Sequence, residues 1–204
     1  MVAEIMKFEN AFGSKGNEQP KGKFLSRFFG IFSEEIIRIW ARDKRCKYID
    51  LGRPTIINPE KGTRFTIDFC LQNKSTGLSY ASEMKCEIEY QDYKYFILNS
   101  PNQLVHHNKE AFKEFLTITK SPKSRTITIR GTEKEISGGI LIWGAGTENG
   151  FSETKEYFGF NDVIFVSDVI RDLIEWKNQE YLNLIYQYRN WVNQFSSDLT
   201  STND

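Results

Sequence analysis

Residues 64–90 constrain the fold most, because they predict two neighbouring strands joined by a turn. Residues 64–71 and residues 78–90 both alternate in side-chain polarity with the period of two that is typical of strands. The polar residues 72–77 between them, ending in glycine, indicate a turn. We therefore predict an antiparallel hairpin, whose first strand has an apolar face made by Phe65, Ile67, Phe69 and Leu71.

The other face of this hairpin places three chemically active side chains together. If the hairpin closes symmetrically about its turn, Asp68 lies opposite Glu83 or within one residue of it, and Lys85 follows on the same face. Directly opposite residues have Cβ atoms roughly 4.5–5.5 Å apart. Two carboxylates at this distance repel each other unless a cation lies between them, and a hard divalent cation suits oxygen ligands. The alternative is an ordinary solvated, ion-paired face that also includes Glu87 and Glu89.

An aspartate on one strand and Glu83-Met-Lys85 on the next resemble the motif of the PD-(D/E)XK nuclease superfamily, which has the restriction-endonuclease-like fold. The core of that family is helix, strand, strand with Asp, strand with Glu-x-Lys, helix, strand, and the resemblance covers roughly residues 23–144. The tripeptide alone is unspecific, because the chain contains four (Asp/Glu)-x-Lys copies. Only the copy at Glu83 has an alternating strand around it and an aspartate on the preceding strand.

The resemblance implies a magnesium-dependent nuclease that hydrolyses DNA phosphodiester bonds as an endonuclease, with RNA as the alternative substrate. Asp68 and Glu83 would hold Mg²⁺, for which Mn²⁺ would substitute, and Lys85 would orient the attacking water and stabilise the developing charge. The family often adds a glutamate from the first helix, and here Glu34 or Glu35 would take that role. The alternative for Glu34 is an i,i+4 ion pair with Arg38.

Two other functions compete with the nuclease. One is a non-catalytic module that keeps the fold and binds nucleic acid or protein. The other is a small-molecule enzyme that uses the glycine-rich residues 144–150, which follow a predicted buried strand. A dinucleotide loop must lead into a helix, and residues 151–160 do not indicate one, so we interpret residues 144–150 as a surface loop. His106 and His107 lack a partner at metal-site spacing and are interpreted as an exposed helix start.

Composition limits the remaining classes. The chain has 204 residues, 39% of them hydrophobic, which suits one domain with a buried core, with or without an appendage. No apolar run approaches the roughly 20 residues of a membrane span, and the N-terminus lacks a signal core. The three cysteines, Cys46, Cys70 and Cys86, are in no CxxC spacing and predict reduced, buried thiols. We expect a cytoplasmic protein with no membrane association.

Charge is unevenly distributed although the formal net charge is zero. Residues 1–74 carry +5, residues 75–134 carry +2 and residues 135–204 carry −7. A basic face on a neutral protein can hold a phosphate backbone. The basic segment around Pro122 is the candidate for nucleic-acid binding, or else a solvated loop and strand edge; it contains Lys120, Lys123, Arg125 and Arg130.

The pattern of elements predicts an α/β fold with a mixed central sheet flanked by helices. The first helix spans residues 24–42, or begins at Ser33 as N-cap if Gly30 interrupts it. The other predicted helices are 102–119, 167–176 and 180–195, and the other predicted strands are 48–57 (broken near Gly52-Arg53-Pro54), 125–129, 140–143 and 163–166.

Three parts follow from this order: an N-terminal arm (1–23), a nuclease-like core (24–166) and a C-terminal helical extension (167–204). The last helix carries an apolar stripe at helical spacing. The extension therefore either packs on the core or forms a homodimer interface, through Tyr181, Leu184, Ile185, Tyr188, Trp191, Val192 and Phe195.

Overall fold

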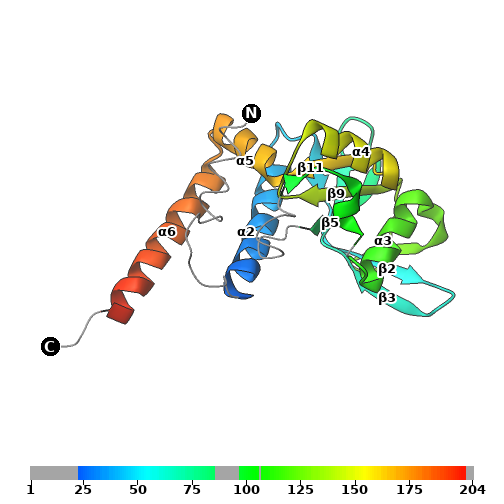
Figure 1. Cartoon of the computed structure of the whole chain (residues 1–204), viewed down its shortest axis with the longest axis horizontal. Helices are drawn as coiled ribbons and strands as arrows, with labels where there is room; N and C mark the ends of the chain where they lie inside the picture. The colour runs from blue at the N-terminus through cyan, green and yellow to red at the C-terminus, as the bar shows by residue number, and fades with distance from the viewer. Residues whose placement is uncertain (1–22, 86–96, 106, 201–204) are drawn as a thin grey trace.

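The computed structural model describes residues 23–85, 97–105 and 107–200. They form a mixed α/β structure in which helices cover both faces of a five-stranded sheet, and a smaller four-stranded sheet lies beside it (Figure 1). The predicted α/β class with a mixed central sheet and flanking helices is therefore confirmed.

The central sheet has the strand order β1-β4-β5-β9-β11. Strand β4 (Phe69–Asn73) pairs antiparallel with both β1 (Tyr48–Asp50) and β5 (Ser79–Lys85). Strands β9 (Gly139–Trp143) and β11 (Asp162–Phe165) continue the sheet in parallel with β5. Every residue of β9 is buried, as its continuous apolar sequence predicts for a central strand.

Alternate side chains of the central strands belong to two separate cores. On one face, α2 (Lys23–Arg42), α5 (Val166–Glu175) and the start of α6 (Gln179–Thr200) pack against Ile140 and Ile142. On the other face, α3 (Glu110–Lys120) and α4 (Glu148–Phe158) pack against Leu141 and Trp143. The period of two in a strand thus gives each face of the sheet its own layer of helices.

The second sheet has the order β3-β2-β7-β8, with β2 (Pro54–Asn58), β3 (Thr63–Thr66), β7 (Thr126–Ile129) and β8 (Thr132–Glu133). Its β2–β3 hairpin projects from the body on the side away from α6 (Figure 1). The break predicted near Gly52 is confirmed, because β1 and β2 belong to different sheets. The prediction of one strand over residues 64–71 is wrong: the chain leaves the small sheet after Thr66 and enters the central sheet at Phe69.

Helix boundaries differ from the sequence prediction in two places. The first helix runs without interruption through Gly30, and Ser33 lies buried within it, so the alternative N-cap at Ser33 is wrong. The predicted helix over 102–119 is instead a 3-10 turn, η1 (Pro101–Leu104), followed by α3 from Glu110. Proline at the first position of η1 suits a helix start, because it has no N–H to leave unpaired there.

Helix α4 was not predicted, because residues 151–160 were interpreted as non-helical. The Thr147 hydroxyl caps it by accepting a hydrogen bond from the backbone N–H of Gly150 at 3.0 Å. Gly159, with a left-handed φ of 74°, ends it. The preceding β10 (Ala145–Gly146) pairs in parallel with β6 (Ile97–Leu98), so residues 144–150 do not form the predicted surface loop.

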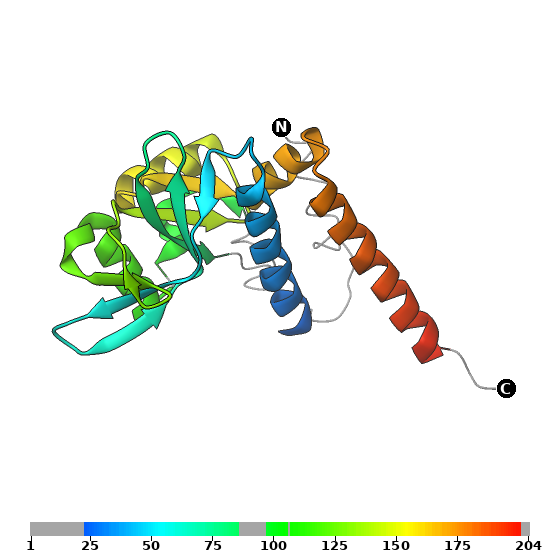
Figure 2. The same ribbon diagram turned by 180° about the vertical axis from the view of Figure 1, so that it is seen from behind.

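The C-terminal helix α6 begins in the core and then leaves it. Tyr181 is buried, and Tyr188 packs against the rings of Phe28 and Phe32 on α2 at centroid distances of 5.8 and 5.7 Å. Beyond this point α6 diverges from α2 (Figure 2), and the stacked rings of Trp191 and Phe195 are each 52% exposed. The first part of α6 therefore packs on the core, and its second part presents half-exposed apolar side chains.

Two of the three cysteines lie in the described part of the chain. Cys46 and Cys70 are buried free thiols, as predicted, whereas Cys86 lies outside the described residues. Burial raises the pKa of Cys46 to about 11 and that of Cys70 to about 12, which keeps both protonated at neutral pH. Among the described helices, none has the length and apolar character required to cross a bilayer.

Candidate active site at the junction of the two sheets

Asp68 and Glu83 lie side by side where the chain passes from the small sheet to the central sheet. Phe69 of β4 pairs with Ser82 of β5, so the next position outward brings Asp68 opposite Glu83. The backbone N–H of Asp68 donates to Glu83 Oε2 at 3.4 Å, and the backbone N–H of Met84 donates to Asp68 Oδ2 at 2.9 Å. These reciprocal bonds hold the two carboxylates together, with the spacing that hairpin symmetry predicts.

Lys85 is the third residue of the site and lies beside the two acids. Its ammonium donates to Glu83 Oε1 at 2.5 Å and lies 5.6 Å from the ring centroid of Phe112 on α3. Glu83 is only 6% exposed, and this burial raises the pKa of its carboxyl above the usual range, against the opposing effect of Lys85. The charge of Lys85 therefore helps to keep Glu83 ionised in a largely buried place.

Arg53 is a fourth charged residue of the site, and the sequence analysis did not identify it. Its Nη2 lies 3.6 Å from Asp68 Oδ1. The sequence gives only a weak signal, a glycine and a proline on either side of the arginine at a predicted strand break. The approach to Asp68 depends on how two sheets meet, which no local pattern reveals.

The two glutamates of the first helix lie on α2, which covers the opposite face of the central sheet. Glu34 pairs with Arg38 at 3.0 Å, which is the i,i+4 alternative considered from the sequence. The guanidinium of Arg38 lies 5.1 Å from the ring centroid of Phe69, the residue after Asp68. Glu35 faces α6 instead: burial raises the pKa of Tyr188, and the charge of Glu35 adds to this effect. The site of Asp68 and Glu83 thus forms from β4, β5 and the β1–β2 connection.

The predicted basic segment is divided by the fold. Arg125 is held in a largely buried ion pair, in which its Nε donates to Glu114 Oε2 at 2.5 Å. Burial alone would raise the pKa of Glu114, but hydrogen bonds from Arg125 and Asn58 outweigh it and lower the pKa. Lys120 ends α3 and Arg130 occupies the β7–β8 turn, and both are exposed. Arg125 therefore neutralises Glu114, and exposed positive charge remains only on the other three residues.

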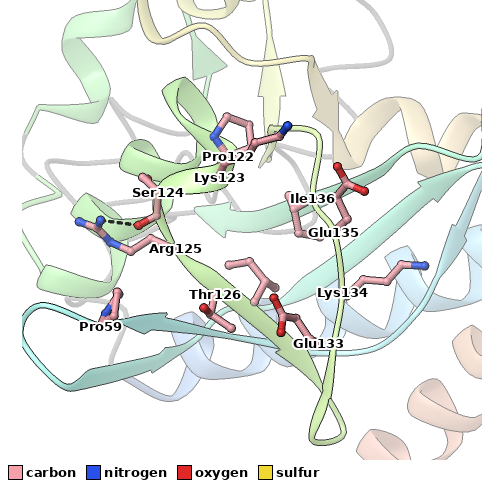
Figure 3. A pocket seen from close by; sticks show the side chains of 11 residues that line it. Pro59, Pro122, Lys123, Ser124, Arg125, Thr126, Glu133, Lys134, Glu135 and Ile136 are labelled. Atoms are coloured by element: carbon pink, nitrogen blue, oxygen red, sulfur yellow. Dashed lines mark hydrogen bonds between the residues drawn. The ribbon is translucent and has the colours of Figure 1, made fainter.

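Lys123 and Arg125 also line a pocket of about 450 Å³ between η2 (Pro122–Ser124), β7 and residues 133–136 (Figure 3). Figure 3 shows the Arg125 guanidinium bonded to the Ser124 carbonyl, and the side chains of Lys123 and Lys134 reaching in different directions. Glu133 and Glu135 line the same pocket. Its charges are therefore mixed and do not converge on one point as an anion site would.

The two weaker motifs have packing roles in the structure. A Cβ atom at Gly146 would lie 2.1 Å from the Phe165 ring, and one at Gly150 would lie 2.0 Å from the Leu98 carbonyl oxygen. Gly146 thus permits β10 to lie close to Phe165 of β11, and Gly150 permits α4 to lie close to the backbone of β6. The ring of His107 is half-buried and lies near Phe112 and Trp143, at centroid distances of 5.3 and 6.1 Å, so it is not the exposed helix start predicted. His106 lies outside the described residues.

Among the residues that the structure describes, the donor set of the site consists of the carboxylates of Asp68 and Glu83. Within residues 23–85, 97–105 and 107–200, no three His, Cys, Asp or Glu side chains converge as a complete metal-binding group; Glu87 and Glu89 lie outside these ranges. Two carboxylates still fit Mg²⁺, which retains several waters and is often bound by only one or two carboxylates. No family model matches the chain, and no match to a curated protein or to a solved structure was found.

Proposed function

We propose that the protein is a divalent-cation-dependent nuclease that hydrolyses phosphodiester bonds in DNA, with Asp68, Glu83 and Lys85 as its catalytic residues. The observation that carries this proposal is the pair of neighbouring carboxylates of Asp68 and Glu83, each of which accepts a hydrogen bond from a backbone N–H of the opposite segment, with the Lys85 ammonium on Glu83. The order α2, β1, β4, β5, α3, β9 supports it, because this is the order of helices and strands in the restriction-endonuclease-like core.

Each residue has a part in the proposed reaction. Asp68 and Glu83 would hold Mg²⁺ or Mn²⁺, which when bound polarises the phosphate and acidifies a water. The hydrogen bond from Met84 fixes Oδ2 of Asp68, and Oδ1 faces the Arg53 guanidinium at 3.6 Å. Lys85 donates to Glu83 and so favours its ionised form, and its ammonium would stabilise the negative charge that develops on a phosphate oxygen.

One observation favours the non-catalytic alternative. Arg53 and Lys85 place two positive charges beside the two carboxylates, so the charges of the site balance within the described part of the chain. A module that binds nucleic acid without cutting it needs no metal at such a site. Lys85, however, is directed toward Glu83 and not away from it, as the catalytic arrangement requires.

Plasmid cleavage tests the proposal directly. Wild-type protein is incubated with supercoiled DNA and Mg²⁺ or Mn²⁺, and nicked and linear products are measured. We expect Asp68→Asn and Lys85→Ala to reduce the rate at least about 100-fold, the scale of losing one charge-stabilising group. Asp68→Asn is preferred to alanine because the amide oxygen can still accept the hydrogen bond from Met84.

Glu153→Ala is the matched control, since Glu153-Thr-Lys155 has the same tripeptide pattern but lies on α4 with Glu153 exposed. It should cleave like the wild type. Cleavage that survives both site variants would place the activity elsewhere or in a contaminant. Binding of DNA without cleavage on supercoiled, linear and single-stranded substrates would support the binding module instead.

We further propose that two copies associate through the exposed half of α6. Trp191, Val192 and Phe195 present half-exposed apolar side chains on one side of this helix. A dimer would supply two active sites, one for each strand of a duplex.

A further inference from the structure

The main chain on both sides of Arg53 is bonded to the main chain on both sides of Asp68. The N–H of Leu51 donates to the carbonyl of Cys70 at 2.8 Å, and the N–H of Cys70 donates to the carbonyl of Gly52, also at 2.8 Å. On the other side, the N–H of Ile67 donates to the carbonyl of Pro54 at 3.0 Å. Arg53 is thereby held directly across from Asp68, although its side chain is on the surface.

Gly52 makes this geometry possible. Its φ of 109° lies in a region that residues with a side chain rarely adopt. Its N–H donates to Asp50 Oδ1 at 2.9 Å, which adds a further anchor to the connection between β1 and β2. The position of Arg53 is therefore set by a rigid backbone rather than by its own ion pair.

The ion pair itself is loose. The distance of 3.6 Å between Arg53 Nη2 and Asp68 Oδ1 exceeds that of a hydrogen bond, and the Arg53 side chain is 54% exposed. Arg38, Arg45 and Arg125, by contrast, hold their carboxylates at 2.5–3.0 Å. The guanidinium of Arg53 can therefore leave Asp68 at little cost, because exposed pairs at such distances contribute little.

Asp68 Oδ2 uses one of its lone pairs on the hydrogen bond from Met84, so we expect a metal to bind Oδ1, the oxygen that faces Arg53. We propose that Arg53 is a substrate-binding residue that neutralises Asp68 in the metal-free site and moves to a phosphate of the nucleic acid when a divalent cation binds. This inference rests on the proposed nuclease function. It assigns a distinct part to each cation: Lys85 stays on the buried Glu83, and Arg53 exchanges between carboxylate and phosphate.

The physical basis is competition between like charges. A divalent cation on Asp68 repels the guanidinium, which then lies within reach of the site with five N–H donors to offer. A guanidinium matches two oxygens of one phosphate in a bidentate arrangement that an ammonium cannot reproduce. Removing Arg53 should therefore strengthen metal binding and weaken nucleic-acid binding, two effects of opposite sign.

The test uses full-length Arg53→Gln and Arg53→Lys. Binding of Mn²⁺ without DNA is measured from the EPR signal of the free ion, and KM and kcat are measured for cleavage. We expect Arg53→Gln to bind Mn²⁺ about two- to fivefold more tightly, because a competing cation is gone. We expect its KM for DNA to rise about tenfold, more than kcat falls, and Arg53→Lys to recover only part of this loss.

Arg42→Gln is the matched control. Arg42 is equally exposed (53%), lies at the C-terminal end of α2 and pairs with Glu180 of α6. It should leave Mn²⁺ affinity and KM unchanged. Unchanged or weaker Mn²⁺ binding by Arg53→Gln would overturn the inference, as would a normal KM despite tighter metal binding. Wild-type protein that neither binds Mn²⁺ nor cleaves DNA would instead refute the proposed function, before Arg53 is considered.

Discussion

Lys85→Met is predicted to destabilise the fold as well as abolish activity, because it leaves a charged carboxylate without its partner. Glu83 is almost fully buried, and its carboxylate accepts hydrogen bonds from the Lys85 ammonium and from the backbone N–H of Asp68. Methionine has a similar length and keeps the packing beside Phe112. The variant therefore removes the positive charge with little change in volume.

The magnitude follows from the geometry of the pair. Unit charges 2.5 Å apart attract by about 6–7 kcal/mol at an effective dielectric of about 20, and most of this offsets the cost of desolvating the two ions. Removing one partner of a buried pair costs about 3–5 kcal/mol. The Lys85 side chain is 22% exposed, so we expect the lower end, about 3 kcal/mol at pH 7. This corresponds to a decrease of about 6–12 °C in Tm.

The loss of stability caused by Lys85→Met should be greater at neutral pH than at acidic pH. Burial raises the pKa of Glu83 in the folded protein, and removing Lys85 raises that pKa further. A carboxyl whose pKa is raised by folding binds its proton more tightly in the folded protein than in the unfolded chain. Its contribution to the free energy of unfolding is therefore complete below the unfolded pKa of about 4.3, and it is lost as the pH rises through the pKa of the folded protein. The loss of unfolding free energy in Lys85→Met, relative to the wild type, is therefore largest at neutral pH and becomes smaller as the pH falls toward 5.

Urea unfolding followed by tryptophan fluorescence at pH 7 and pH 5 measures both effects. Lys113→Met is the control, because Lys113 and Glu110 form a pair at 2.8 Å with both side chains more than half exposed, and its loss should stay below about 0.5 kcal/mol. Glu83→Gln combined with Lys85→Met should recover most of the stability, since no buried charge remains. Equal losses of unfolding free energy in Lys85→Met and Lys113→Met would refute this reasoning, as would a loss in Lys85→Met that does not change with pH.

Two further predictions concern packing and assembly. Gly150→Ala should lower the free energy of unfolding by about 1–3 kcal/mol, because the new Cβ would lie 2.0 Å from the Leu98 carbonyl oxygen. Gly30→Ala in α2 should raise the free energy of unfolding by up to about 1 kcal/mol, since no atom lies within 4 Å of the new Cβ. Thermal unfolding compares the two variants, and equal effects would contradict the packing argument. Trp191→Ser with Phe195→Ser should convert a dimer to a monomer in sedimentation-velocity experiments while plasmid binding by each chain persists, and an unchanged sedimentation coefficient would show that α6 is not the interface.

Local sequence determined the elements whose signal lies within one strand or helix. The alternation of residues 78–85 and the turn before them specified the register that brings Asp68 opposite Glu83, because strand pairing across a tight turn leaves little freedom. The apolar residues of β9 predicted a central strand, and the spacing of apolar residues predicted α2, because burial and helical period are properties of a short segment.

Contacts between distant segments decided the rest. The split of residues 64–71 between two sheets depends on hydrogen bonds from Ile67 to the first residue of β2 and from Cys70 to the connection between β1 and β2. The same bonds bring Arg53 to Asp68, and the pairing of Arg125 with Glu114 removes it from the predicted basic surface. Partners 11 to 19 residues apart leave no periodic trace in the sequence, because hydrogen bonds and ion pairs are made wherever packing of the apolar faces places their atoms.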